Sequence, residues 1–320
     1  MLTRPLEIAR RRLTLLTDRI HTLPVLVLMP HSRCNCRCVM CDIWKANGSP
    51  REISAGDLSA HLEALRRLRV QWVVLSGGEA LMHGDVDALC SLLRQIPARI
   101  TLLSTGLLLA PRAARVVECC DEVIVSLDGS RGVHDGIRRV PRAFDRLAEG
   151  VAALRAVAPG YRVTGRCVLQ RRNWFDLPNI IRAAHEIGLD GISFLAADVS
   201  STAFNRPEGW KPDRVADIAL DGAEARAFAQ VVEQVVREFE PDFASGYIAE
   251  TPAKLRRIPA YYGALAGAGE LPEVTCNAPW VSAVVEPDGA VRPCFFHPPI
   301  GHLDDGPLDE VVNSAAARGF

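Results

Sequence analysis

The sequence contains no apolar run long enough to cross a membrane and no secretory signal at its N-terminus. Its longest apolar stretches, residues 23–30 and 100–111, fall well short of the roughly 18 residues that a membrane-spanning helix needs. Three arginines at residues 10–12 sit in an amphipathic stretch that we expect to form a solvated helix. These features predict a cytoplasmic protein that does not bind membranes.

Lysine is scarce and net charge is nearly absent. Lysine occurs only at Lys45, Lys211 and Lys254, and the formal charge of the chain is -1. The chain therefore has no overall attraction to nucleic acid. With 48% hydrophobic and 23% charged residues over 320 positions, it has the composition of a folded protein. Its length suits one large domain or a domain with an appendage.

Cysteine, by contrast, is abundant. The chain has ten cysteines, and four of them fall within a single short segment: Cys34, Cys36, Cys38 and Cys41. A disulfide framework is not expected in a chain of this size without an export signal. The clustering instead indicates ligation of a metal ion or a metal cluster.

Six nearly continuous apolar segments have the character of parallel strands buried on both faces. They are residues 25–29, 72–76, 100–104, 123–127, 162–169 and 191–196. Helical apolar stripes lie between them, so the pattern predicts about six right-handed βαβ units. Six units are too few for an eightfold barrel, and the candidates are a partial barrel and a doubly wound sheet.

The pattern changes after residue 196. A Pro-, Gly-, Asn- and Ser-rich loop is expected at residues 198–213, and a hairpin at residues 281–286 and 290–292 with its turn between them. We divide the chain into an N-terminal helix (1–24), the main α/β region (25–200), a linker with helices that complete the core (201–273) and a small C-terminal cap (274–320).

The four clustered cysteines directly follow the first expected strand. They therefore lie at the carboxyl end of the sheet, where ligand sites gather. A structural zinc site normally takes its ligands as two separated pairs, and packing cysteines do not gather in a polar loop. An iron–sulfur cluster fits better, because one short loop can reach several irons that lie a few ångström apart.

Cys34, Cys38 and Cys41 give the spacing C-x3-C-x2-C, which resembles the signature of the radical S-adenosylmethionine (radical SAM) enzymes. The resemblance implies a 4Fe-4S cluster on these three thiolates, with S-adenosylmethionine at the fourth iron. It also implies a partial (β/α)6 TIM-like barrel with a twitch-like cap of a β-hairpin and helix. Met40 occupies the place of a bulky group against adenine, and Cys36 is expected to pack under the loop.

The ends of the later strands extend this resemblance. Gly77, Gly78 and Glu79 are similar to the family's GGE motif, which binds the methionyl amino group, although Ala80 stands where the family usually has proline. Further cofactor contacts are implied at the ends of the third to sixth strands, for Ser104, Ser126, Asp128, Arg166 and Leu195. Serine and aspartate at such positions also cap helices, and leucine also suits a core.

Cys276 and Cys294 resemble the opening of a SPASM or twitch domain, which binds an auxiliary iron–sulfur cluster. No cysteine follows Cys294. We therefore expect an incomplete site or further residues beyond the last one, rather than ligation by His297 and His302. Two free buried thiols are the alternative. The remaining cysteines are expected to pack in the core: Cys90, Cys119, Cys120 and Cys167.

The resemblance implies an enzyme in which a 5'-deoxyadenosyl radical, made by reductive cleavage of S-adenosylmethionine, abstracts hydrogen from an unactivated carbon. A flavodoxin or ferredoxin is the expected reductant, and no nucleic acid is expected as a partner. A small-molecule substrate, oxidised or rearranged, is favoured over a ribosomally made peptide, because no leader-binding domain precedes the barrel.

An iron–sulfur electron-transfer protein is the alternative from another class, but an electron carrier needs no nucleoside pocket. Three residues are candidates for substrate binding: Asp198, Asn277 and Trp280. Asp198 equally suits the capping of its own loop.

Overall fold

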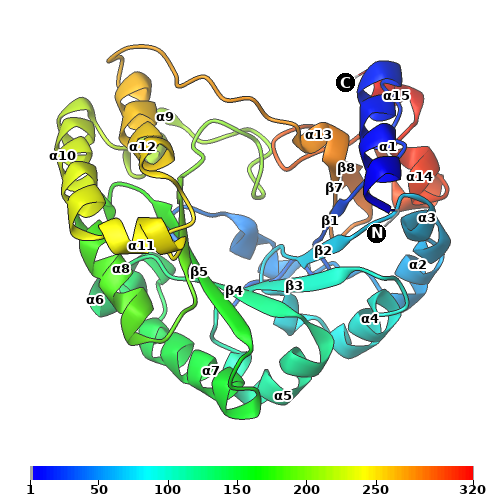
Figure 1. The fold of residues 1–320 in the computed structure, drawn as a ribbon, viewed down its shortest axis with the longest axis horizontal. Helices are drawn as coiled ribbons and strands as arrows, with labels where there is room; N and C mark the ends of the chain where they lie inside the picture. The colour runs from blue at the N-terminus through cyan, green and yellow to red at the C-terminus, as the bar shows by residue number, and fades with distance from the viewer. Residues whose placement is uncertain (1–2, 320) are drawn as a thin grey trace.

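Six parallel strands form one side of an open barrel (Figure 1). The computed structural model describes residues 3–319. The strands agree with the expected segments to within one residue: β1 (Val25–Leu28), β2 (Trp72–Leu75), β3 (Arg99–Ser104), β4 (Glu122–Ser126), β5 (Arg162–Leu169) and β6 (Ile192–Ala196). They stand in the sheet in chain order. A doubly wound sheet would reverse this order part-way, so the partial barrel is confirmed.

Helices cover the convex side of this sheet (Figure 1). Those between the strands are α2 (Ala55–Ser59), α3 (Leu62–Arg67), α4 (Val86–Leu93), α5 (Leu109–Cys119), α6 (Arg131–Arg138), α7 (Ala143–Val157) and α8 (Leu177–Glu186). After β6 come α9 (Pro212–Ala216), α10 (Gly222–Glu238), α11 (Glu240–Ser245) and α12 (Pro252–Leu265). Tyr262 of α12 is fully buried, and its hydroxyl donates to the Leu169 carbonyl at 2.6 Å, which ties this helix to the end of β5.

Strand β5 is buried on its helix side only, which differs from the burial on both faces expected from its apolar run, whereas β2 and β3 bury consecutive residues on both faces. In β5, Val163 and Cys167 are fully buried against the helices. Arg162 and Arg166 alternate with them and are exposed on the concave face. The difference arises because the barrel is open, so its concave face is free to receive other groups.

The C-terminal hairpin continues the barrel sheet. Its first strand, β7 (Ser282–Val285), runs parallel to β1 with Ser282 level with Val25, and it pairs antiparallel with β8 (Ala290–Arg292). Gly289 in the turn has φ of +88°, a left-handed conformation that suits glycine. The rest of this region comprises α13 (Ala278–Val281), β9 (Gly301–His302), α14 (Leu308–Val311) and α15 (Ala315–Arg318). The cap and the barrel thus share one nine-stranded sheet.

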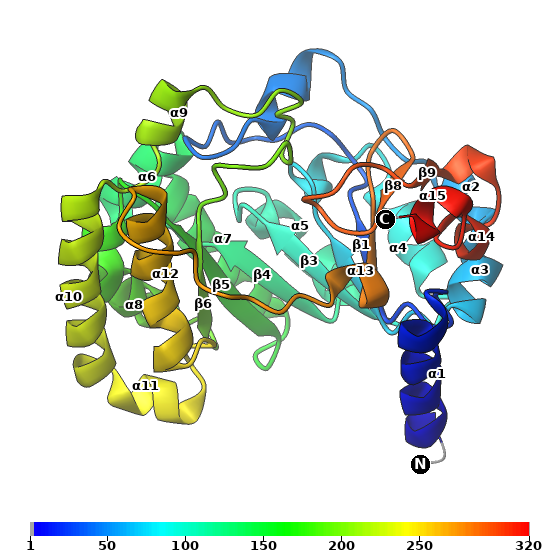
Figure 2. The same ribbon diagram turned by 90° about the horizontal axis from the view of Figure 1, so that it is seen from above.

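The first helix, α1 (Thr3–Thr17), projects from the body of the molecule (Figure 2). It ends before β1, and the exposed side chains of Leu15 and Leu16 lie on it. Across residues 3–319, no helix combines the length and the apolar character needed to cross a bilayer.

Candidate active site

The cysteine loop joins β1 to a short 3₁₀ turn, η1 (Ile43–Gly48), and its two ends are tied to neighbouring backbone. At its start, the Ile53 amide donates to the Pro30 carbonyl at 3.0 Å. From η1, the Asn47 side chain accepts from the Cys34 amide and donates to the Cys34 carbonyl, each at 3.0 Å. The loop is therefore closed on itself, and one compact turn carries all the clustered thiols.

The Gly-Gly-Glu turn after β2 packs against the first residues of this loop. A Cβ atom on Gly78 would lie 2.0 Å from the Arg33 carbonyl oxygen, and Gly77 has φ of +102°. The Glu79 amide donates to the same Arg33 carbonyl at 2.9 Å. Both glycines are thus required by the close approach of two backbone segments.

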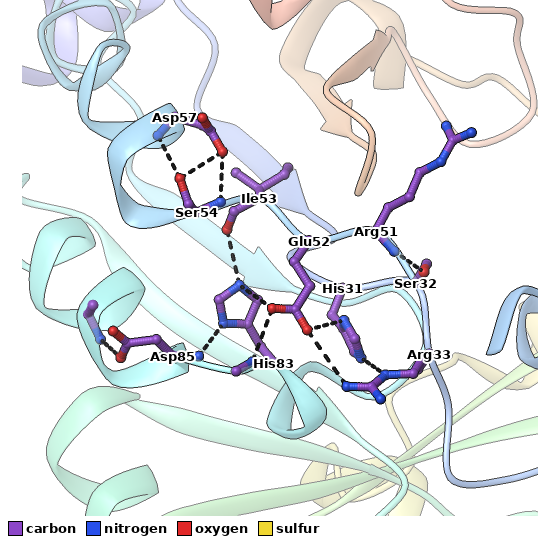
Figure 3. Close-up of polar contacts among 12 residues, drawn as sticks. His31, Ser32, Arg33, Arg51, Glu52, Ile53, Ser54, Asp57, His83 and Asp85 are labelled. Atoms are coloured by element: carbon purple, nitrogen blue, oxygen red, sulfur yellow. Dashed lines mark hydrogen bonds and ion pairs between the residues drawn. The ribbon is translucent and has the colours of Figure 1, made fainter. Parts of the chain in front are cut away.

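A histidine network braces the entry to the cysteine loop (Figure 3). His31 is fully buried, with its Nδ1 3.0 Å from Glu52 Oε1 and its Nε2 accepting from Arg33 Nε at 3.0 Å. His83 lies on the other side of Glu52, with its Nε2 3.0 Å from the Ile53 carbonyl. Burial lowers the pKa of His31 and favours the neutral ring that accepts the Arg33 bond. Arg33 directly precedes Cys34, so the network fixes the position of the backbone at the first clustered cysteine.

The opposite side of the loop rests on the end of α6. The amides of Arg37 and Val39 donate to the carbonyls of Arg138 and Ile137 at 3.1 and 3.0 Å. Carbonyls in the last turn of a helix have no partner within the helix. The cysteine loop supplies these partners, and the segment around Cys38 is held in place as a result.

The structure brings the three predicted cluster ligands together. Burial, followed by the charge of Cys38, raises the pKa of Cys34 and raises that of Cys41 to about 12. The pKa of Cys38 is lowered by its hydrogen bond with Cys36, and also by Arg138, which donates to its Sγ at 3.4 Å. As thiolates, these three side chains repel one another. A cationic group that binds them offsets this repulsion. The donor set therefore fits a 4Fe-4S cluster with three cysteine ligands.

Cys36 is part of the loop's packing. It is 1% exposed and lies in an apolar cluster with Leu107 and Ala143, against which Met40 also packs.

In the part of the chain that the structure describes, no group of three or more His, Cys, Asp or Glu side chains is placed so that it could hold a metal ion.

The predicted loop after β6 lies over the end of the cysteine loop. Trp210 Nε1 donates to Asp42 Oδ2 at 2.8 Å, and Asn205 Nδ2 donates to the Asp42 carbonyl at 3.1 Å. Arg206 stacks on the Trp210 ring at 4.4 Å. Asp198 is used inside this loop, where it pairs with Arg206 and accepts the Ser200 and Ser201 amides at 3.2 Å. These contacts correspond to the loop-capping alternative for Asp198.

Glu79 is fully buried and braces the end of β3. Its Oε2 accepts the Thr105 amide and hydroxyl, both at 2.7 Å, and the Ser104 hydroxyl at 3.0 Å. The Thr105 hydroxyl oxygen also lies 2.9 Å from the side-chain amide of Asn35 in the cysteine loop. Glu79 and Ser104 thus connect three loops to one another. Their predicted contacts with the methionyl amino group and the ribose stay predictions.

A polar row crosses the concave face from the last residue of β4 through the middle of β5 to the second residue of β6. Ser126 is in register with Arg166, and Arg166 with Ser193, to which its Nε donates at 3.4 Å. Leu195 is 41% exposed on the same face, two residues further along β6. A guanidinium with an adjacent hydroxyl is suited to binding a carboxylate.

Asp128 is turned away from this row. It is fully buried and pairs with Arg138 at an N–O distance of 2.5 Å, while its Oδ1 accepts the Val168 amide at 2.9 Å. Burial raises the pKa of Asp128, and the Arg138 charge opposes this shift. The resemblance implies a cofactor contact for Asp128, which stays a prediction, and in this structure the carboxylate belongs to a buried ion pair behind the cysteine loop.

Two buried amide groups near the site lack partners. Gln170, directly after β5, is fully buried, and within residues 3–319 neither its Oε1 nor its Nε2 forms a hydrogen bond. The Nδ2 of Asn35, between two of the clustered cysteines, is also buried and unpaired. Buried polar groups are rarely left unpaired, so these atoms suit a polar ligand at this end of the barrel.

The two cysteines of the second pair differ in their exposure to solvent. Cys276 is exposed, whereas Cys294 is 9% exposed and its Sγ accepts the Phe296 amide at 3.4 Å. Both ring nitrogens of His302 are engaged, Nε2 with the Asp288 carbonyl at 2.5 Å and Nδ1 with the Asp304 amide at 3.2 Å. Two thiols do not complete the ligand set of an iron–sulfur cluster, and His302 is held within the hairpin.

Asn277 and Trp280 lie at the other end of the sheet from the cysteine loop. Asn277 precedes α13 and Trp280 lies within it. This helix leads directly into β7, and β7 starts level with the first residue of β1. Trp280 lines a hollow there together with Asp18 and Leu23. The predicted substrate contacts of this pair therefore have no support from their placement.

Sequence reasoning missed three residues that position the site: Thr105, His134 and Arg138. His134 Nδ1 accepts the Asp128 amide at 3.1 Å, while Thr105 and Arg138 contact the cysteine loop directly. Arg138 and His134 share α6, and their inward direction depends on how that helix packs. Only Thr105, next to the predicted Ser104, had a local signal as a strand-end hydroxyl.

Comparison with protein families gives two matches. The sequence model of the radical SAM superfamily matches residues 28–184, which include the cysteine loop and the Gly-Gly-Glu turn. A model described as an iron–sulfur cluster-binding domain, SPASM, matches residues 276–320.

Curated relatives share part of their length with this chain. The pre-heme d1 synthase of Dinoroseobacter shibae is 29% identical over 63% of this chain and 52% of its own. The AdoMet-dependent heme synthase of Methanosarcina barkeri is 25% identical over 48% of this chain and 45% of its own. The subtilosin biosynthesis protein AlbA of Bacillus subtilis is 20% identical over 88% of this chain and 58% of its own. The chain thus spans about half the length of the curated relatives it matches.

Solved structures show the same fold. Streptococcus suis SuiB bound to precursor peptide SuiA has a TM-score of 0.67 at 16% identity, covering 96% of this chain and 68% of SuiB. AnSMEcpe with bound AdoMet has a TM-score of 0.69 at 17% identity, covering 92% of this chain and 82% of that one.

Proposed function

Because this chain belongs to the radical SAM superfamily and carries a SPASM domain, we propose that it cleaves S-adenosylmethionine reductively and abstracts hydrogen from a small-molecule substrate. When bound to Cys34, Cys38 and Cys41, a 4Fe-4S cluster supplies the electron for this cleavage, which yields methionine and a 5'-deoxyadenosyl radical. The observation that carries the proposal is the gathering of these three thiols between the Gly-Gly-Glu turn and the end of α6.

The chain's own residues hold the reactants in this proposal. Arg166 and Ser126 bind the methionyl carboxylate, since they stand side by side in register on the concave face, Ser126 at the carboxyl end of β4. Gln170 and Asn35 offer the amide groups that still lack partners. The loop held by Trp210 shields the cysteine loop from water, and such positioning is the protein's main contribution to radical chemistry.

Two further groups belong to the proposal. The SPASM match implies an auxiliary iron–sulfur cluster, for which this chain offers Cys276 and Cys294. Two thiols are too few for a complete site, so we assign no step to this cluster. Radical SAM chemistry needs a reductant, and a flavodoxin or ferredoxin is our proposal for it.

A tetrapyrrole is the small-molecule class best supported by the relatives. Three of them are named as a pre-heme d1 synthase, an AdoMet-dependent heme synthase and an Fe-coproporphyrin III synthase. A peptide substrate is the second candidate. The favouring observation is coverage, since AlbA matches 88% of this chain and peptide-bound SuiB covers 96% of it.

Isotope transfer distinguishes these substrates. Anaerobically reconstituted protein is reduced with dithionite and given S-adenosylmethionine with either a deuterated tetrapyrrole or a deuterated precursor peptide. Deuterium in 5'-deoxyadenosine from the tetrapyrrole supports the first proposal, and deuterium only from the peptide supports the second. A protein that holds a cluster but never cleaves S-adenosylmethionine is an electron carrier, and the proposed function is then wrong.

A further inference from the structure

We propose that Arg138 is a positioning residue that raises the reduction potential of the cluster on Cys34, Cys38 and Cys41. Its guanidinium donates to the Cys38 Sγ at 3.4 Å from behind the cysteine loop. The inference rests on the proposed function, because it requires that Cys38 is a cluster ligand.

Arg138 is held in this position from two directions. Its side chain pairs with the fully buried Asp128 at an N–O distance of 2.5 Å, and its carbonyl accepts the Arg37 amide at 3.1 Å. The residue is 6% exposed although it carries a charge. The last residue of α6 thus binds the cysteine loop with its backbone and one cysteine sulfur with its side chain.

The expected effect on the cluster follows from charge. One-electron reduction adds a negative charge to the cluster and its thiolates. A cationic donor on a ligating sulfur stabilises that added charge, and hydrogen bonds to sulfur are an established determinant of iron–sulfur potentials. Arginine stays protonated throughout the accessible pH range, so its effect is permanent.

Asp128 partly offsets this effect, because its carboxylate pairs with Nη2 of the same guanidinium whose Nη1 donates to Cys38. The direct hydrogen bond to the sulfur nevertheless comes from the cation. Burial of an unpaired guanidinium is strongly unfavourable, which explains why Asp128 accompanies it. The pair fixes the distance between the charge and the cluster ligand.

The test is an anaerobic potentiometric titration of the reconstituted full chain, followed by the electron paramagnetic resonance signal of the reduced cluster. Arg138→Gln is expected to lower the equilibrium constant for reduction at least tenfold, which is about 59 mV for one electron. Arg138→Lys, which keeps the charge, is expected to recover most of the shift. Arg139→Gln is the matched control, since Arg139 is the exposed neighbour on the same helix end, and it is expected to leave the potential unchanged.

In Arg138→Gln, the buried Asp128 carboxylate has lost its partner, which can prevent the protein from folding or from taking up its cluster. In that case the double variant Asp128→Asn with Arg138→Met is titrated instead, because it leaves no unpaired buried charge. Asp128→Asn alone keeps the cation, so a potential that is unchanged or raised supports the proposal. Unchanged potentials without Arg138, a lowered potential in Asp128→Asn, or loss of the cluster from every variant lacking Arg138 would overturn it. Absence of any cluster from the wild type would instead contradict the proposed function.

Discussion

At the scale of single residues, Arg166 is a cation on the concave face of β5. It lies between Ser126 and Ser193 in register and forms no direct ion pair within residues 3–319, although the charge of Glu250 acts on it. Its guanidinium therefore has room for a direct contact with an anionic group. Arg162, on the same strand and face, lies at the other end of β5 and pairs with Glu122 at 3.3 Å.

Arg166→Gln is expected to weaken the binding of S-adenosylmethionine by roughly 10- to 100-fold, because a hydrogen bond to a charged group contributes about 1.5–3 kcal/mol. Isothermal titration of the reconstituted protein measures the dissociation constant directly. Arg162→Gln is the matched control and is expected to leave it unchanged. An Arg166 variant that binds as tightly as the wild type would remove this residue from the cofactor site.

At the scale of elements, α6 connects the cysteine loop to the end of β4. Its last turn accepts amides of the cysteine loop, and His134 on its buried side accepts the Asp128 amide at 3.1 Å. Burial lowers the pKa of His134 well below its ordinary value of 6.5. Protonation of this ring would remove the acceptor and place a charge near Arg138.

The unfolded chain takes up a proton on His134 near pH 6.5, whereas the folded chain resists it. The unfolded state then binds more protons, so the free energy of unfolding falls as the pH drops below about 6.5. The slope from this residue approaches about 1.4 kcal/mol per pH unit. His134→Asn keeps an acceptor without this titration. Urea unfolding between about pH 7.5 and 5 is expected to show a shallower slope for the variant, and equal slopes would contradict this role.

The strands and the cysteine loop could be predicted because their signals are local. A buried parallel strand is a short apolar run, and the three proposed ligands of one cluster lie within a single loop of the sequence. The roles of Arg138 and His134 could not be predicted, because both depend on how α6 packs. Arg138 contacts Cys38, about 100 positions away in the chain. His134 contacts the backbone of Asp128, just after β4. The same reason explains why the ion pair of Asp128 with Arg138 could not be predicted.

At the scale of the whole molecule, the C-terminal region completes the barrel sheet. The sequence predicted its hairpin but not its partner, since pairing between β1 and β7 joins segments at opposite ends of the chain. β7 covers the edge of the strand that leads into the cysteine loop, and the Met29 amide donates to the Val285 carbonyl at 2.8 Å. The cap therefore supports the cluster loop as well as carrying Cys276 and Cys294.

A chain shortened to end at residue 273 is expected to lose cooperative thermal unfolding and to aggregate. It would expose the edge of β1, and unpaired edge strands promote aggregation. Soluble yield and a melting curve, compared with the full chain, measure this directly. A matched control with Cys276→Ala and Cys294→Ala in the full chain removes the thiols but keeps the sheet, and it is expected to fold. Equal melting of the shortened chain would show that β7 is dispensable.

The most direct test of the account is the formation of 5'-deoxyadenosine by matched cysteine variants under anaerobic reducing conditions. Cys38→Ala removes a proposed ligand of the cluster, whereas Cys36→Ala removes a buried thiol of the same loop that packs with Leu107 and Ala143 and hydrogen-bonds to Cys38. The account predicts that Cys38→Ala abolishes the product and that Cys36→Ala retains most of it. Product formation by Cys38→Ala with an intact cluster would contradict the assignment of Cys34, Cys38 and Cys41 as the site of S-adenosylmethionine cleavage.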